Sequence, residues 1–277
     1  MEHVTELLYR LKRIFISIII IGAILSLIPI DFKYYIPLVS YFPNLIINYV
    51  IPKRIVWHGT VINVHIAQYN PFAGFNLLIK SALLLGLLGA SPIIVHEIYA
   101  FIAPALYPHE KKFIRNITIV GLFLFLLGII VSIKIVLPTA YKIMIITSSA
   151  ITGPNTLIAF SDIEQLFSSI ILISVATGLA LEAPLIVYLL VSFGVIEYKW
   201  FKGENKKFIL FLSMLIGAVI SPDPSGMGMV VIGMLMYISI MFSAKLGDRY
   251  KKRKEENNVK PVKIIKPEPE LVNNTQS

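Results

Sequence analysis

Among the acidic side chains that lie within or beside long apolar stretches of this 277-residue chain, five are its clearest candidates for chemistry: Glu6, Glu97, Glu110, Glu182 and Asp223. A carboxylate in such surroundings can pair bidentately with a guanidinium, hydrogen-bond a polar group on a neighbouring helix, or carry a proton. Because an unpaired charge is costly away from water, each of these acids is a functional-site hypothesis. The residues point to binding or to ion coupling.

Motifs for catalysis in water are missing from the sequence. Two His-Glu pairs, at 96–97 and 109–110, begin an H-E-x-x-H pattern, but Ala100 and Phe113 stand where the second histidine of a zinc site is required. The chain has no cysteine and no Gly-rich phosphate loop ending in Lys-Ser/Thr. We therefore expect no metal, no cofactor and no enzymatic activity, and a membrane-embedded hydrolase is a remote interpretation.

The elements that must position these acids are membrane-spanning helices. Hydrophobic residues make up 56% of the chain and charged residues only 15%, which is outside the range of soluble domains. A spanning helix needs about 20 apolar residues. The sequence predicts an all-α, polytopic fold of six spans kinked at prolines, with the last two forming a short hairpin: residues 14–30, 75–102, 116–138, 165–196, 208–222 and 224–244.

The distribution of basic residues predicts the orientation of the spans, because Lys and Arg are retained on the cytoplasmic side. Basic residues cluster before the first span, in the second and fourth connections and after the sixth span, whereas the opposite side has only Lys33, Lys53, Arg54 and Lys142. Both termini are expected to face the cytoplasm. Topology thus explains the net charge of +9 without a nucleic-acid partner. Residues 246–277 are expected to form a basic, disordered cytoplasmic tail.

Four of these acids, Glu6, Glu97, Glu110 and Glu182, have an ordinary structural alternative to a functional role. Glu182 lies two residues before Pro184, which should kink the helix and free carbonyl groups beside the acid, but an intramolecular contact would also account for it. Glu97 lies one turn before Phe101 on the same helical face, near the membrane surface, where an acid reaches water at little cost.

The two remaining acids on the cytoplasmic side are also open to both interpretations. Glu6 belongs to an amphipathic N-terminal helix, where a local pair with Arg10 at i, i+4 would suffice to explain it. Glu110 follows Pro104 and Pro108, which restrict the loop and would order the acid before a ligand binds. Glu110 could equally be an ordinary solvated acid of the loop.

Several blocks of sequence carry more information together than apart. They are residues 3–11 (HVTELLYRL), 90–92 (ASP), 100–107 (AFIAPALY), 109–112 (HEKK), 182–184 (EAP) and 221–223 (SPD), together with Phe75 and Lys80. In this order, over residues 3–245, they resemble TatC, the core receptor subunit of the twin-arginine protein translocase. The chain departs from the family pattern at several positions. Leu8 stands where the family has arginine, His96 where it has tyrosine, Glu97 where it has glutamine and Tyr99 where it has tryptophan, and residues 224–227 lack the Ser-Gln of the family.

The resemblance implies a role for each acid. It implies that Glu6 and Glu110, with Phe101, bind the two arginines of a signal peptide at the cytoplasmic face. Glu97, where the chain departs from the family, is expected to belong to the same site, and Pro104 and Pro108 are expected to order the loop that carries Glu110. It implies that Glu182, Pro184 and Asp223 form an intramembrane polar site that contacts single-span partners of the TatA or TatB type. Export of folded proteins by the proton motive force, in the cell membrane and by a self-associating complex, is implied as well.

A different class of function stays open at this point. A proton-coupled carrier of small solutes would use the intramembrane acids Glu97, Glu182 and Asp223 as its relay. Internal repeats that mark many carriers are missing from the sequence, which weakens this alternative. In the receptor interpretation, Glu97 either adds negative charge to the signal site or carries a proton on its own.

Overall fold

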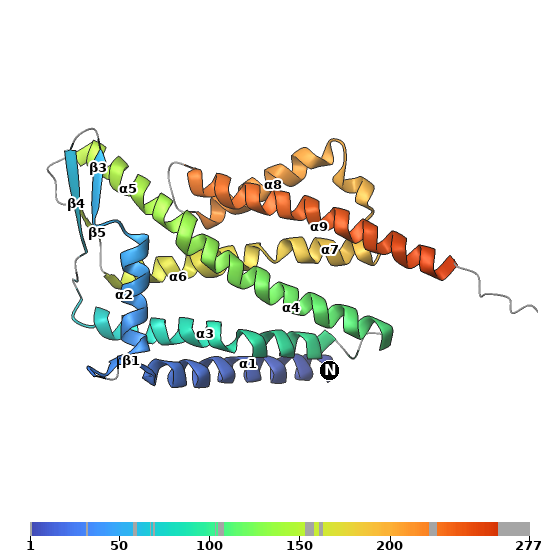
Figure 1. The fold of residues 1–277 in the computed structure, drawn as a ribbon, viewed down its shortest axis with the longest axis horizontal. Coiled ribbons are helices and arrows are strands. Elements are labelled where there is room, and N and C mark those ends of the chain that lie inside the picture. Colours follow the sequence, from blue (N-terminus) through green and yellow to red (C-terminus); the bar gives the residue numbers. More distant parts are fainter. Residues whose placement is uncertain are drawn as a thin grey trace, which may run out of the picture.

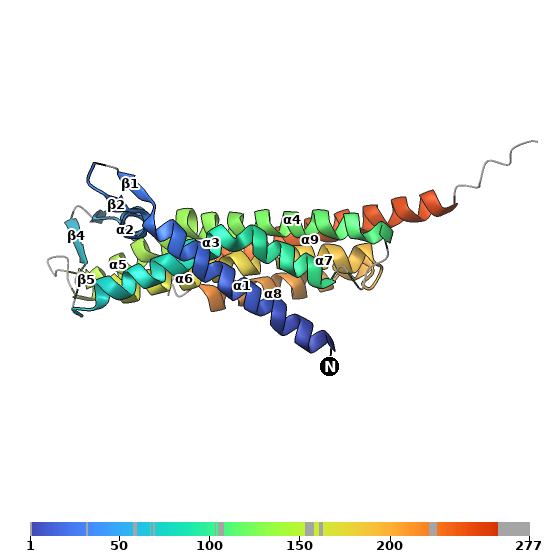
Figure 2. The ribbon, with the colours of Figure 1, turned by 90° about the horizontal axis from the view of Figure 1, so that it is seen from below.

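Long helices that lie side by side form the body of the protein. The computed structural model describes residues 2–31, 33–57, 60–66, 68, 70–102, 104, 108–152, 158–160, 163–221 and 226–259. The long helices run roughly along one axis in two perpendicular views (Figures 1 and 2): α1 (Glu2–Leu27), α3 (Ala73–Ile102), α4 (Pro108–Val131), α6 (Ile163–Ala180), α7 (Ala183–Ser192), α8 (Asn205–Ile220) and α9 (Met227–Val259). The mainly helical class expected from the sequence is confirmed.

One end of the bundle is not purely helical, which corrects the all-α expectation. A two-stranded sheet of β1 (Pro29–Asp31) and β2 (Ile36–Pro37) precedes the short helix α2 (Leu38–Val50). A second sheet pairs β3 (Arg54–Trp57) antiparallel with β4 (Thr60–Ile66), and β4 parallel with β5 (Ile158–Phe160). The β-branched residues of 55–56 and 61–66 favour strands. These elements lie opposite the end that carries the N-terminus (Figure 1).

The helix around the expected span 116–138 does not end at Pro138. After α4, a π-helical segment (Ser132–Val136) leads directly into α5 (Leu137–Thr152). Proline lacks the backbone N–H that an α-helix requires, and a π-helical turn accommodates this loss without ending the helix. The resulting apolar helix, Lys111–Ile151, has 41 residues, or about 60 Å at about 1.5 Å per residue. It is about twice as long as a hydrocarbon core is thick.

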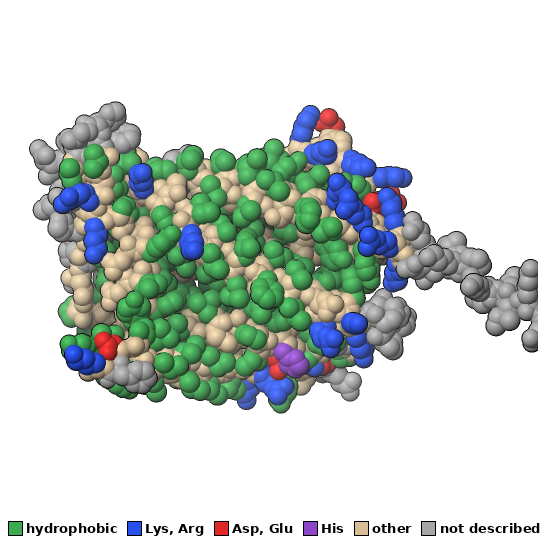
Figure 3. All heavy atoms as spheres, viewed as in Figure 1, with side chains coloured by type: hydrophobic (Ala, Val, Ile, Leu, Met, Phe, Trp, Pro, Cys, Tyr) green, Lys and Arg blue, Asp and Glu red, His purple; other side chains and the backbone are tan. Residues whose placement is uncertain are grey.

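Four helical segments among the described residues are long and apolar enough to cross a membrane: Ala73–Phe101, Lys111–Ile151, Ile163–Ser192 and Met227–Lys254. Two of the six expected spans fall on helices that are not among these four. The first lies in α1, whose N-terminal half carries Arg10, Lys12 and Arg13, and the fifth lies in α8, which has only 16 residues. Figure 3 shows hydrophobic side chains over most of the visible face, with Lys and Arg gathered where the N-terminus and α9 lie.

The final helix corrects the expectation for the tail. Residues 246–259 are helical, because α9 continues to Val259 and leaves the bundle (Figure 1). The segment is rich in Lys, Arg and Glu, which are good helix formers, and Lys252 pairs with Asp248 one turn earlier at 2.8 Å. Disorder therefore does not begin at residue 246. Residues 260–277 lie outside the described part of the chain.

Glycines let several helix pairs approach to backbone contact. A Cβ atom on Gly22 of α1 would lie 2.6 Å from the carbonyl oxygen of Ala82, and one on Gly86 of α3 would overlap the carbonyl oxygen of Ile18. Between α4 and α6, a Cβ atom on Gly128 would likewise lie 2.6 Å from the Cα atom of Gly178. Small residues at such crossings are the usual means of packing helices in membranes. The crossing of α1 and α3 positions the polar cluster described next.

Candidate functional site

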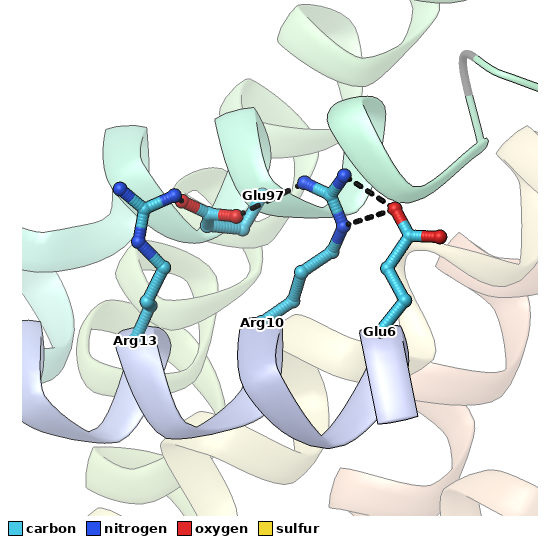
Figure 4. Close-up of polar contacts among 4 residues, drawn as sticks. All are labelled: Glu6, Arg10, Arg13 and Glu97. Carbon is cyan, nitrogen blue, oxygen red and sulfur yellow. Dashed lines mark hydrogen bonds and ion pairs between the residues drawn. The ribbon is translucent and has the colours of Figure 1, made fainter. Parts of the chain in front are cut away.

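The N-terminal half of α1 and the last turns of α3 bring together a cluster of four charged side chains. Glu6, Arg10 and Arg13 follow one another at intervals of four and three residues, so they share one face of α1. This face points at Glu97 of α3 (Figure 4). We refer to these four residues as the charged cluster.

Arg10 bridges the two acids of the charged cluster. Its Nε and Nη2 atoms donate to Oε1 of Glu6 at 3.1 and 2.6 Å, and its Nη1 atom donates to Oε2 of Glu97 at 3.2 Å. The hydrogen bond to Glu6 is the main reason why the pKa of Arg10 lies above its ordinary value, and the charges of Glu6 and Glu97 act in the same direction. Arg10 therefore stays charged at every physiological pH.

Glu97 is the buried anchor of the charged cluster. Its two carboxylate oxygens accept from different arginines, Oε2 from Arg10 and Oε1 from Nη1 of Arg13 at 3.1 Å. The side chain of Glu97 is only 6% exposed, compared with 36% for Glu6 and 56% for Arg13. Two arginines therefore occupy both oxygens of this carboxylate. Glu6 is the acid that a ligand can reach.

The structure places the other expected residues of the signal site only in part. Phe101 lies one turn beyond Glu97 on α3 and is exposed, and Pro104 is exposed as well. Pro108 is the first residue of α4 and Glu110 the third. Proline is favoured at the first position of a helix and acids are favoured in its first turn. The side chains of Pro108 and Glu110 lie outside the described part of the structure, as do residues 105–107.

Glu182 lies apart from the charged cluster, in the middle of a candidate span. Residues 181 and 182 form a turn between α6 and α7, and Pro184 is the second residue of α7. Glu182 is partly exposed and lies ten residues before the end of α7, about 15 Å along the helix axis. Asp223, the third member of the expected intramembrane site, lies outside the described residues.

Sequence reasoning missed a second polar cluster, between α3 and α6. Lys80 donates to Oε1 of Glu164 at 2.5 Å and to Oγ of Ser168 at 2.7 Å, while Asn76 donates to Oε2 of Glu164 at 3.0 Å. Lys80 interrupts an apolar span, and a cation there requires an anionic partner. That requirement is the signal that would have pointed to Glu164. The cluster ties two spans together near the end of the bundle that carries the sheets.

Comparison with known proteins gives matches in one protein family. The sequence profile of the family described as "Sec-independent protein translocase protein (TatC)" matches residues 2–234. A TatC protein of Aquifex aeolicus is 33% identical over 192 residues, which cover 68% of this chain and 78% of the relative. One of Carboxydothermus hydrogenoformans is 27% identical over 247 residues, which cover 88% and 91%.

Solved structures show the same fold. A crystal structure titled as the twin-arginine translocase receptor TatC in DDM superposes with a TM-score of 0.66 at 27% identity, covering 88% of this chain and 99% of that one. A second TatC structure gives a TM-score of 0.62 at 28% identity over the same shares. The chain therefore belongs to the TatC family of Sec-independent protein translocase proteins, and is a multi-pass cell-membrane protein that takes part in protein transport.

Proposed function

We propose that this chain is the receptor and core subunit of a twin-arginine translocase, and that it binds the paired arginines of signal peptides at its cytoplasmic face. In this proposal the chain crosses the membrane six times with both termini in the cytoplasm. It has no catalytic residue and exports folded proteins by using the proton motive force. The single observation that carries the proposal is the geometry of Glu6, which already holds a guanidinium and remains partly exposed.

Glu6 is suited to exchange one arginine for another. Arg10 uses only Oε1 of Glu6, so Oε2 accepts no hydrogen bond from a described residue. An incoming signal arginine can therefore approach the free oxygen first and then displace Arg10. Arg10 keeps its second partner, Glu97, during this exchange. Glu97 thus serves the site by holding the chain's own arginines and partly neutralising their charge, which would otherwise repel the cationic ligand.

The second signal arginine is assigned to Glu110. This acid belongs to a different element, the first turn of α4, and the helix N-terminus is a position where a carboxylate is stabilised. Reading two adjacent arginines requires two acids on separate, ordered elements. Pro104 and Pro108 restrict the connection between α3 and α4, and Phe101 supplies an exposed ring beside it.

Binding of an Arg-Arg signal peptide compared with its Lys-Lys counterpart tests the proposed function. The protein in nanodiscs is expected to bind the Arg-Arg peptide at least about tenfold more tightly, because lysine cannot form the planar, bidentate pair. Fluorescence anisotropy with labelled peptides measures the two affinities, and solute uptake into proteoliposomes that contain this chain alone tests the carrier alternative. Equal affinities for the two peptides would overturn the receptor assignment.

Glu182, with Pro184 and Asp223, is proposed to form the intramembrane contact for single-span partners of the TatA or TatB type. Hydrogen bonds between helices in membranes contribute about 1 kcal/mol or less, so each contact is weak and reversible. Such contacts suit a complex that assembles on demand, including the self-association proposed for the active state.

Replacing Glu182 by alanine is expected to lower partner co-purification by about fivefold while sparing signal-peptide binding, because one weak interhelical bond is removed far from the charged cluster. Co-purification from detergent and peptide anisotropy measure the two effects. Glu197→Ala, which removes an exposed acid after α7, is the matched control. Undiminished recovery of the partner with Glu182→Ala would remove this residue from the contact.

A further inference from the structure

A groove between α4, α7 and α9 has no role in the proposed function. It has a volume of about 710 Å³. Its walls are mainly apolar, with Val120 and Leu124 on α4, Leu185 on α7 and Phe242 on α9. All three elements belong to candidate membrane spans, so the apolar part of the groove lies at the depth of the membrane. In Figure 1, α7 lies behind the space between α4 and α9.

The length of the groove matches one leaflet of a bilayer. Along α4 its lining runs from Phe113 to Leu124, which is about 16 Å at 1.5 Å per residue. Along α9 it runs from Ser239 to Arg253, about 21 Å. Half of a hydrocarbon core is about 15 Å thick. The apolar part therefore fits acyl chains in one leaflet, and the last turn on α9 extends to the level of the headgroups.

That outer end of the groove is cationic. Arg249 and Arg253 are one helical turn apart, line the groove and are exposed. Among the described side chains, neither guanidinium is within ion-pair distance of a carboxylate, and the nearby Asp248 pairs with Lys252. Stacked rings of Phe113 and Tyr250, with centroids 4.4 Å apart, form a rigid wall beside them. Two guanidinium groups at headgroup level that have no carboxylate partner among the described side chains call for an anionic ligand.

We propose that this groove is a binding site for an anionic phospholipid. The phosphodiester accepts hydrogen bonds from Arg249 and Arg253, and an acyl chain lies along Val120 and Leu185 toward the middle of the membrane. An apolar transmembrane helix of a partner would cover the apolar walls but would supply no anion for the two arginines. The proposal needs only the membrane location of the chain and does not depend on signal-peptide binding.

Native mass spectrometry with added lipids tests the site. Phosphatidylglycerol is expected to bind the detergent-purified protein at least about tenfold more tightly than phosphatidylcholine with the same acyl chains. The double variant Arg249→Gln/Arg253→Gln should reduce this preference to less than twofold. The control is Lys245→Gln/Lys254→Gln, which makes the same charge change on α9 at residues that do not line the groove, and it should keep the preference.

A third variant separates the groove from its cationic rim. Ser243→Trp fills the groove and leaves both arginines in place, so it should lower the affinity for both lipids at least fivefold with an unchanged unfolding temperature. If the two double variants reduce the preference equally, the lipid responds only to total charge and the site assignment is wrong. Undiminished lipid binding to Ser243→Trp would also overturn it, as would crosslinking of Val120→Cys to another polypeptide that lipid does not displace.

Discussion

Replacing Glu6 or Glu110 by alanine is expected to lower the affinity for an Arg-Arg signal peptide at least about tenfold, and replacing both is expected to abolish measurable binding. A charge-assisted hydrogen bond to a partly desolvated carboxylate contributes about 1.5–3 kcal/mol, whereas a fully solvated pair contributes well under 1 kcal/mol. Glu6 is only 36% exposed, which places its ligand pair toward the stronger end of this range. Crosslinking and anisotropy with a labelled signal peptide measure the effect.

The same experiment has an internal standard. Glu204→Ala removes an acid that is 86% exposed, pairs locally with Lys207 and belongs to a connection expected on the same face of the membrane. This control should bind the peptide like the unaltered protein. Membrane insertion and the unfolding temperature should be the same in all variants, because Arg10 keeps Glu97 when Glu6 is lost. Normal crosslinking in both the Glu6 and the Glu110 variants would rule out the two-acid site.

Replacing Gly86 by alanine is expected to have the largest effect on the fold. The added Cβ would overlap the carbonyl oxygen of Ile18 and lie 3.1 Å from the Cα atom of Gly22, and these are backbone atoms that cannot rotate away. Overpacking of this kind costs about 1–3 kcal/mol or more. Because α1 packs chiefly against α3, the two helices should separate and the charged cluster should break apart. Accumulation in membranes and signal-peptide binding should both fall sharply.

Gly89 provides a matched comparison on the same helix. A Cβ atom there would meet the side-chain ends of Ile21 and Leu25 at 2.7 and 2.8 Å, and flexible side chains can shift. Gly89→Ala should therefore accumulate and bind peptide nearly normally. If Gly86→Ala were as stable as Gly89→Ala by thermal unfolding in detergent, the backbone contact between α1 and α3 would not be what positions the site.

Local patterns in the sequence were sufficient to predict the mainly helical, multi-pass class of the protein. Uncharged stretches identified the helices, and an apolar span interrupted near Pro184 predicted an irregularity that the structure has at residues 181–182. The expected span 116–138 ends at Pro138, but the helix in which it lies continues beyond this residue. A π-helical turn accommodates the missing N–H there, and the pattern of apolar and charged residues does not reveal such a turn.

The sequence alone determined that this chain is a helical membrane protein, that its family is TatC and which acids are candidates for the functional site, because composition, periodicity and motifs are properties of neighbouring residues. The tertiary structure alone decided what those acids contact. Glu97 meets Arg10 and Arg13 across 87 and 84 residues of sequence, and Lys80 meets Glu164 across 84. Such pairs depend on how two helices cross, and for α1 and α3 that crossing is set by the contact of Gly22 with Gly86, which no local pattern encodes.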